Sequence, residues 1–303
     1  MFAATSFADP WRFQPNVEVY LLVVFLIGAY TYMVRVIGPK AVGPGEEIVT
    51  RRQLRCFVGS MVMLFAASTW PIHQIGEDYL YSAHMVQHMM LSYFLPPLVL
   101  LATPEWLLRV LVGNGLTYRI VRFFAKPVVA AVLFNGMVMI THIPGVVNGT
   151  TVNGPLHFAL HLMVVLSAVL AWMPVVGPLP EMQMKPGGKM IYLFLFGVIP
   201  TVPAGWLAMA ERPVYSHYGD QPVRVWNIDA INDQQVAGLF MKVGGGMFLW
   251  TIVIYMFFKR FGKEGPRENS YRREPEPTYE PLTYDVVTAA FDASKAPADA
   301  EPR

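Results

Sequence analysis

Seven apolar segments constrain the fold more than any other feature, because each is about as long as the roughly 20 residues that a helix needs to cross a bilayer. They fall at residues 17–37, 54–72, 80–102, 124–142, 156–176, 189–208 and 235–258. Hydrophobic residues make up 54% of the chain and charged residues 15%, whereas a soluble domain carries about a quarter charged. The sequence therefore predicts an all-α, polytopic membrane protein with seven transmembrane helices.

Lysine and arginine set the predicted orientation of these helices. The chain has 23 lysine and arginine residues, and 19 of them lie in segments that seven crossings place on one side of the membrane. Three lie on the other side, and Lys242 lies inside the last span. Positive charge accumulates on the cytoplasmic side, so the N-terminus is expected outside and the C-terminus in the cytoplasm. Prolines in the third and sixth spans are expected to kink those helices without ending them.

Three regions follow from this topology. Residues 1–16 are expected to form a short outer segment and residues 17–260 the seven-helix transmembrane domain. Residues 261–303 are charged and proline-bearing without an apolar period, which predicts a disordered cytoplasmic tail. The single cysteine, Cys56, excludes an internal disulfide and a thiolate cluster.

The predicted topology places every histidine on the outer side or in the outer leaflet. Two pairs repeat one pattern, His-x-x-x-His, in "HMVQH" and "HFALH", and this spacing puts both rings of a pair on one helical face. The pairs are His84 with His88 and His157 with His161; His142 and His73 end neighbouring spans at similar depth. Imidazole without thiolate suits copper, zinc or iron. The pattern predicts a metal site, with His217 outside it.

The last span opens with the polar residues Asp233 and Gln234 and carries Lys242 about two turns further in. We expect Lys242 to pair with a carboxylate such as Asp233 or Asp229. Three consecutive glycines, 244–246, allow close approach of another helix. We expect no acidic side chain beside the paired histidines, because the third and fifth spans contain none.

Three motifs resemble one family, the seven-helix CtaG-type cytochrome c oxidase assembly proteins of bacteria. "SAHMVQHMMLSYFLPPLVLLATP" is similar to the family's His-Met-x-Gln-His-Met segment with its Pro-Pro pair, and "INDQQVAGLFMKVGGG" to the segment that opens its last helix. "HFALHLMVVLSAVLAWMPVVGP" resembles its fifth span. The resemblance covers about residues 17–260 and implies a role in building haem–copper oxidases.

The resemblance also implies which residues carry the function. The histidines would bind metal, and Gln87, Asp233 and Gln234 would orient them by hydrogen bonds. The expected protein is a non-enzymatic chaperone of the respiratory chain in the bacterial plasma (inner) membrane, with its histidine site facing the periplasm. It would bind copper and supply it to cytochrome c oxidase subunits. Copper donor proteins could be further partners, and no nucleic acid is expected.

Three other functions stay open at this point. The first is a b-type haem protein, with one histidine of each pair as an axial ligand. The second is a membrane metalloenzyme, against which the lack of a carboxylate near the histidines and of a His-Glu-x-x-His motif argues. The third is a structural scaffold for the oxidase whose histidines only form hydrogen bonds.

Overall fold

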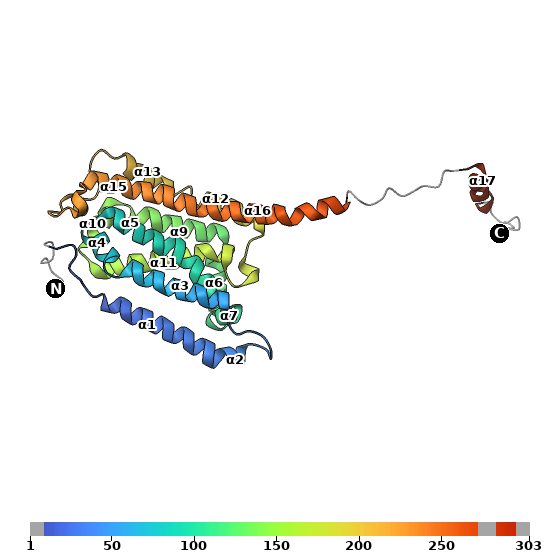
Figure 1. Cartoon of the computed structure of the whole chain (residues 1–303), viewed down its shortest axis with the longest axis horizontal. Coiled ribbons are helices and arrows are strands. Elements are labelled where there is room, and N and C mark those ends of the chain that lie inside the picture. The colour runs from blue at the N-terminus through green and yellow to red at the C-terminus, as the bar shows by residue number, and fades with distance from the viewer. Residues whose placement is uncertain (1–8, 272–282, 295–303) are drawn as a thin grey trace. The chain divides into compact units, whose positions relative to one another are not determined.

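The structure is a computed structural model that describes residues 9–271 and 283–294, and helices dominate it (Figure 1). It divides into two units, Met1–Phe257 and Phe258–Arg303. Among the described residues, six helices of the first unit are long and apolar enough to cross a membrane, and the last continues into the second unit. They are α1–α2 (Val17–Ala41), α3–α4 (Arg51–Asp78), α5–α6 (Tyr81–Ala102), α11 (Gly154–Val176), α12–α13 (Pro186–Met209) and α15–α16 (Ala230–Arg260).

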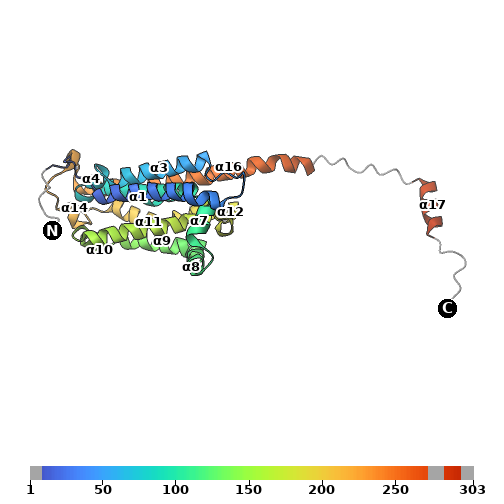
Figure 2. The same ribbon diagram turned by 90° about the horizontal axis from the view of Figure 1, so that it is seen from below.

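The fourth predicted span is a bent pair of helices. Helix α8 (Leu116–Phe124) and α9 (Pro127–Thr141) pass the same test together but differ in direction by 72°. Counted as one span, the pair brings the number of crossings to seven. Figure 2 shows α1 beside α3 and α9 beside α11, in agreement with the contacts between these helices. The prediction of an all-helical membrane protein is confirmed.

Several spans are built from shorter pieces. The pieces are α1 (Val17–Tyr32), the π turn η1 (Met33–Ile37), α2 (Gly38–Ala41), α3 (Arg51–Ser68), α4 (Ile72–Asp78), α5 (Tyr81–Met89), the π turn η2 (Met90–Phe94), α6 (Leu95–Ala102), α12 (Pro186–Phe196), α13 (Thr201–Met209), α15 (Ala230–Leu239), the π turn η5 (Phe240–Gly244) and α16 (Gly245–Tyr271). Shorter helices lie between the spans: α7 (Glu105–Val112), α10 (Pro144–Thr151) and α14 (Ser216–Gly219).

Prolines account for two of the interruptions. Pro96 and Pro97 open α6 directly after η2, since a proline has no N–H to bond the carbonyl one turn earlier and its ring crowds that carbonyl. The π turn absorbs the misfit and the span continues. In the sixth span, α12 ends at Phe196 and α13 begins after Pro200. Both spans are interrupted at the positions where their prolines predict kinks.

The second span extends beyond its predicted end at residue 72. After Ser68 the chain turns through residues 69–71 and resumes as α4, which reaches Asp78. Gly76 of α4 lies so close to α5 that an added Cβ would stand 2.9 Å from the backbone nitrogen of His84. This close approach holds α4 against the start of α5 and brings the neighbouring residue, Glu77, into the bundle.

An aromatic core joins the third, fourth, fifth and sixth spans. Tyr93, Phe134, Trp172 and Phe196 are buried together, with the rings of Phe134 and Phe196 stacked at 4.8 Å between centroids. Each such ring buries a large apolar area and fixes the neighbouring helices at a defined distance. The core therefore fixes the relative positions of these four spans, two of which carry the paired histidines.

The tail differs from its prediction. Helix α16 continues to Tyr271, and α17 (Tyr284–Ala293) is a helix within residues predicted to be disordered. Val286, Val287 and Phe291 recur in it at helical spacing, a short period that the surrounding charges and prolines obscure. Residues 1–8, 272–282 and 295–303, which complete the predicted end segments, lie outside the described residues.

Candidate metal site

A single carboxylate, Glu77, lies among the histidines at one end of the bundle. Its Oε1 accepts a hydrogen bond from Nδ1 of His84 at 3.1 Å, and its Oε2 lies 3.1 Å from Nε2 of His157. Nδ1 of His73 and Nε2 of His161 stand further off, at 3.8 and 4.0 Å from Oε1. The expectation that no acidic side chain lies beside the histidines is wrong, because that expectation ended the second helix before Glu77.

The two His-x-x-x-His pairs face each other across α5 and α11. Ring centroids lie 4.5 Å apart within the pair His84–His88 and 4.3 Å apart within His157–His161. Between the helices, the rings of His88 and His161 are separated by 4.6 Å. The helical spacing thus brings four imidazoles from two distant segments into direct contact. We call the end of the bundle that carries them and Glu77 the histidine end.

Two sets of three side chains could each hold one ion. In the first, His84, His88 and His161 each offer one ligand atom, and these atoms lie within 4.8 Å of one another. Glu77, His157 and His161 form the second set on the same criterion. His161 belongs to both. In the first set Glu77 stands behind His84, where a carboxylate fixes the tautomer and leaves Nε2 free to bind metal.

Acceptors at the helix starts hold the two pairs in place. The carboxylate of Asp233 accepts hydrogen bonds from the backbone N–H groups of Tyr81 at 2.6 Å and Ser82 at 3.1 Å, and also from the Ser82 hydroxyl. These are unsatisfied donors of the first turn of α5. At α11 the side chain of Asn153 accepts from the backbone of Leu156 at 3.2 Å. Asp233 therefore positions the histidine helix without touching a histidine.

Gln87 and Gln234 also act on neighbouring groups. The amide of Gln87 donates to Nδ1 of His73 at 3.0 Å, so it orients that ring and not the ring of His84. Gln234 accepts from the backbone N–H of Val214 at 2.6 Å. It thereby ties the sixth connection, residues 210–229 between α13 and α15, to α15. His73 contacts Glu77 from outside both ligand sets.

His142 lies apart from the four paired rings. Its Nδ1 donates to the carbonyl of Val138 at 2.6 Å, which leaves the buried Nε2 without a hydrogen-bond partner in the described structure. That ring faces a cavity of about 30 Å³ shared with His88 and three methionines, Met85, Met89 and Met241. The structure therefore places His142 beside the candidate site and outside both ligand sets.

The sixth connection folds over α4 and holds the backbone around Glu77. Nε2 of His217 donates to the carbonyl of Glu77 at 2.9 Å, and the Tyr218 hydroxyl donates to the carbonyl of Gly76 at 2.9 Å. Tyr215 donates to the carbonyl of His142 at 3.0 Å. Burial raises the pKa of Tyr215 to about 12, so its hydroxyl keeps its proton. Sequence reasoning missed this role of His217, because partners 140 residues apart leave no local pattern.

The site is small and partly buried. A cavity of about 30 Å³ is lined by Glu77 and the four paired histidines, together with Thr141, Val146, Val147, Thr150, Thr151, Leu160 and Tyr218. Glu77 is 17% exposed, and His157 and His161 are each 18% exposed. Nε2 of His157 is buried and has no hydrogen bond of good geometry in the described structure. A space of this size holds one water or ion.

The comparisons with known proteins identify the family. The model of one family, the cytochrome c oxidase caa3 assembly factors, matches residues 28–262, a range that includes Glu77 and all seven histidines. The chain belongs to this family. No curated protein and no solved structure matches it. Membership agrees with the motif resemblance and with the membrane-spanning bundle, and it makes the chain an assembly factor for cytochrome c oxidase.

The Lys242 pairing predicted from the sequence is wrong. Asp233 is engaged by Tyr81 and Ser82, and Asp229 accepts hydrogen bonds from the backbone and side chain of Asn232 at the start of α15. Both carboxylates lie at the histidine end, whereas Lys242 stands more than two turns further along the helix. A lysine side chain does not span that distance along its own helix.

Proposed function

We propose that this assembly factor binds one copper ion at the histidine end and passes it to a subunit of cytochrome c oxidase, without catalysing a reaction. The observation that carries the proposal is the convergence of Glu77 with the two His-x-x-x-His pairs in one small cavity. Up to four imidazoles and one carboxylate are available, more donors than one ion uses at a time. Such a surplus permits ligand exchange, which transfer to another protein requires.

The donor set and the space favour copper over haem. Imidazole nitrogen is a ligand that suits copper. A b-type haem would need a porphyrin ring between a histidine of α5 and a histidine of α11. Those rings are already in contact, with centroids of His88 and His161 4.6 Å apart, and the cavity of about 30 Å³ is far below the several hundred Å³ of cofactor sites.

The same cavity argues against a metalloenzyme. Glu77 supplies the carboxylate that the sequence did not place near the histidines, so a general base is present in principle. A space for one ion leaves no room for an organic substrate beside it. Family membership also favours a role in assembly.

Charge distribution supports a definite orientation. Lysine and arginine gather in the connections at the end of the bundle opposite the histidines, and that end is expected on the cytoplasmic side. We therefore place the protein in the bacterial inner membrane with its histidine end toward the periplasm. Copper would then be received and released on the outer side.

Metal analysis of the purified full chain tests the proposal. Wild-type protein in detergent is titrated with Cu(I) against a chromophoric chelator, and its visible spectrum is recorded; we expect one bound copper and no Soret band. The double variant His84→Ala/His88→Ala should lose this binding and reduce oxidase assembly in cells. Met163→Leu, which changes an exposed methionine close to His161, is the matched control. An unchanged copper stoichiometry in the double variant would refute the proposal and favour a scaffold role.

A further inference from the structure

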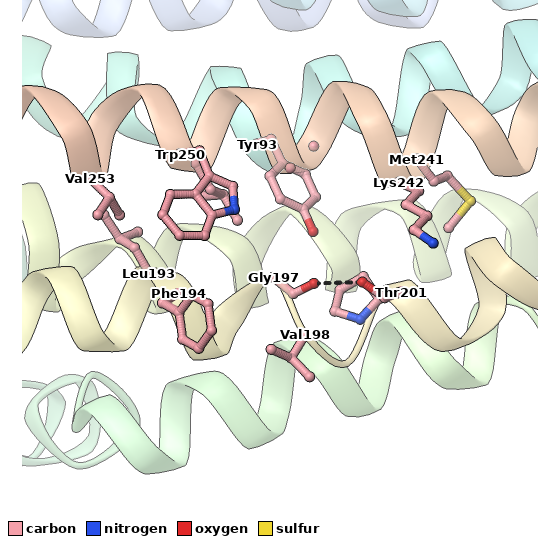
Figure 3. Close-up of a pocket in the computed structure, with 14 residues that line it drawn as sticks. Tyr93, Leu193, Phe194, Gly197, Val198, Thr201, Met241, Lys242, Trp250 and Val253 are labelled. Atoms are coloured by element: carbon pink, nitrogen blue, oxygen red, sulfur yellow. Dashed lines mark hydrogen bonds between the residues drawn. The ribbon is translucent and has the colours of Figure 1, made fainter.

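A third and larger cavity lies in the middle of the bundle and opens sideways between α16 and the break that separates α12 from α13. Its volume is about 380 Å³. Figure 3 shows Lys242, Met241 and Thr201 at one end and Trp250, Val253, Leu193 and Phe194 at the other. We call this cavity the Lys242 groove. Its lining is apolar and aromatic apart from the ammonium of Lys242 and the hydroxyls of Thr201 and Tyr93.

Lys242 is the unusual member of this lining. It is the thirteenth residue of the 31-residue span Ala230–Arg260, so it lies about 18 Å along the helix from its start. It is exposed, and its ammonium has no hydrogen bond or ion pair in the part of the chain that the structure describes. The lysine stem is shorter than the distance to either end of this helix, so the charge stays within the span. A charge at mid-membrane is costly and calls for a partner.

The backbone on both sides of the groove is irregular. Lys242 sits on the π turn η5, an element that often marks functional sites. Across from it, residues 197–200 interrupt the sixth span, where the Thr201 hydroxyl donates to the carbonyl of Gly197 at 3.1 Å. Irregular backbone is tolerated at membrane depth where it lines a cavity or is covered by protein. The irregular backbone on both sides of the groove is therefore what we expect of a surface that another protein covers.

A lipid does not match the distribution of charge. An anionic lipid keeps its headgroup at the membrane surface, whereas Lys242 lies near the middle of its span. The groove becomes apolar and aromatic toward the end of α16 remote from the histidines. A lipid with its headgroup on Lys242 would therefore have its acyl chain directed toward a membrane surface, opposite to its orientation in a bilayer. A transmembrane helix, in contrast, can present a side chain at any depth.

A second copy of the chain does not supply the missing charge. The acidic residues within the spans and the bent pair are Glu18, Glu77, Asp78 and Asp233. Each lies within the first or last four residues of its span. No acidic residue of the described spans thus stands at the depth of Lys242. The complementary carboxylate has to come from another protein.

We infer that the Lys242 groove docks a transmembrane helix of a partner protein, whose Asp or Glu at mid-membrane pairs with Lys242. Gly245 and Gly246 line the groove and leave its α16 wall without side chains at these two positions, as close helix approach requires. Val198, Phe194 and Trp250, each about half exposed, would be buried by the incoming helix. The identification of the partner as an oxidase subunit rests on the proposed function. The inference that the partner is a transmembrane helix with an acidic residue does not depend on it.

A pair of synthetic helices tests the chemistry directly. The full chain is reconstituted in phosphatidylcholine vesicles with a labelled Leu–Ala transmembrane peptide that carries one central Glu, or Gln in the matched peptide. We expect the Glu peptide to bind about three- to tenfold more tightly, the range of polar contacts between membrane helices. Lys242→Met should abolish the difference, and Lys189→Met, in the first turn of the sixth span, should not. Equal binding of both peptides to the wild type would overturn the inference.

Photo-crosslinking in cells then identifies the partner. A benzophenone side chain is placed at Val198 in the groove, or at Val128 on α9, which is 75% exposed, as the control. We expect a product with an oxidase subunit from Val198 alone, lost in the Lys242→Glu variant. Products with lipid only, or with a second copy of the chain, would contradict the inference. Lys242→Met should bind copper like the wild type. A failure of the docking inference is therefore distinguishable from a failure of the copper-binding proposal.

Discussion

Replacement of Glu77 by glutamine is the most direct test of the candidate site. The substitution preserves the size and shape of the side chain and removes its charge. Glu77 lies 3.1 Å from both His84 and His157, so it is either a ligand of the ion or the residue that fixes the tautomer of His84. Loss of such a carboxylate costs about 10- to 100-fold in metal affinity. This corresponds to about 1.4–2.8 kcal/mol of binding free energy.

The assay is a competitive Cu(I) titration of the purified full chain, with Asp78→Asn as the matched control. Asp78 is the next residue, but its carboxylate accepts a hydrogen bond from Gln74 and belongs to neither ligand set. We expect the copper affinity of Glu77→Gln to fall by the stated factor and that of Asp78→Asn to stay within about twofold of wild type. Unchanged affinity in Glu77→Gln, or an equal loss in both variants, would refute the role given to Glu77.

Three further substitutions separate the parts of the site. His161→Ala should weaken Cu(I) binding more than His142→Ala in the same titration, because His161 belongs to both ligand sets. Gly76→Ala should lower the free energy of unfolding by about 1–3 kcal/mol in thermal denaturation, because its Cβ would meet the His84 backbone. Asp233→Asn should cost about 0.5–2 kcal/mol by removing the charged acceptor at the start of α5; equal copper occupancy at saturation would show that it is no ligand.

Local patterns in the sequence are sufficient to predict much of this structure. The spans follow from runs of apolar residues, and the pairing of rings on α5 and α11 follows from the i,i+4 spacing of their histidines. Both signals are contained in about 20 consecutive residues. The contact between the two histidine faces depends on how the helices of the bundle pack. The similar membrane depth of the two pairs is consistent with that contact but does not determine it.

Glu77 could not be placed in the same way. It follows His73 by four residues, which is the available signal, but the segment 73–80 mixes polar and apolar residues and therefore predicts a connection. Its place depends on the contact of Gly76 with α5 and on the hydrogen bond from His217, 140 residues away. Likewise, the isolation of Lys242 depends on the hydrogen bonds that engage Asp229 and Asp233 elsewhere, which no local sequence pattern predicts.

The presence of one carboxylate in the described ligand sets has a consequence for the ion. The bound imidazoles are neutral. Among the described residues of the two sets, Glu77 is the only negative charge: it is a member of the second set and a hydrogen-bond partner of His84 in the first. A monovalent Cu(I) ion with this carboxylate forms a neutral unit, whereas Zn(II) leaves one uncompensated positive charge. Uncompensated charge is costly in a partly buried site at the edge of a bilayer. Wild type should therefore prefer Cu(I) to Zn(II) in direct competition, and Glu77→Gln, which leaves either ion uncompensated, should bind both more weakly. Displacement of Cu(I) from the wild type by an equal concentration of Zn(II) would show that charge balance does not select the ion.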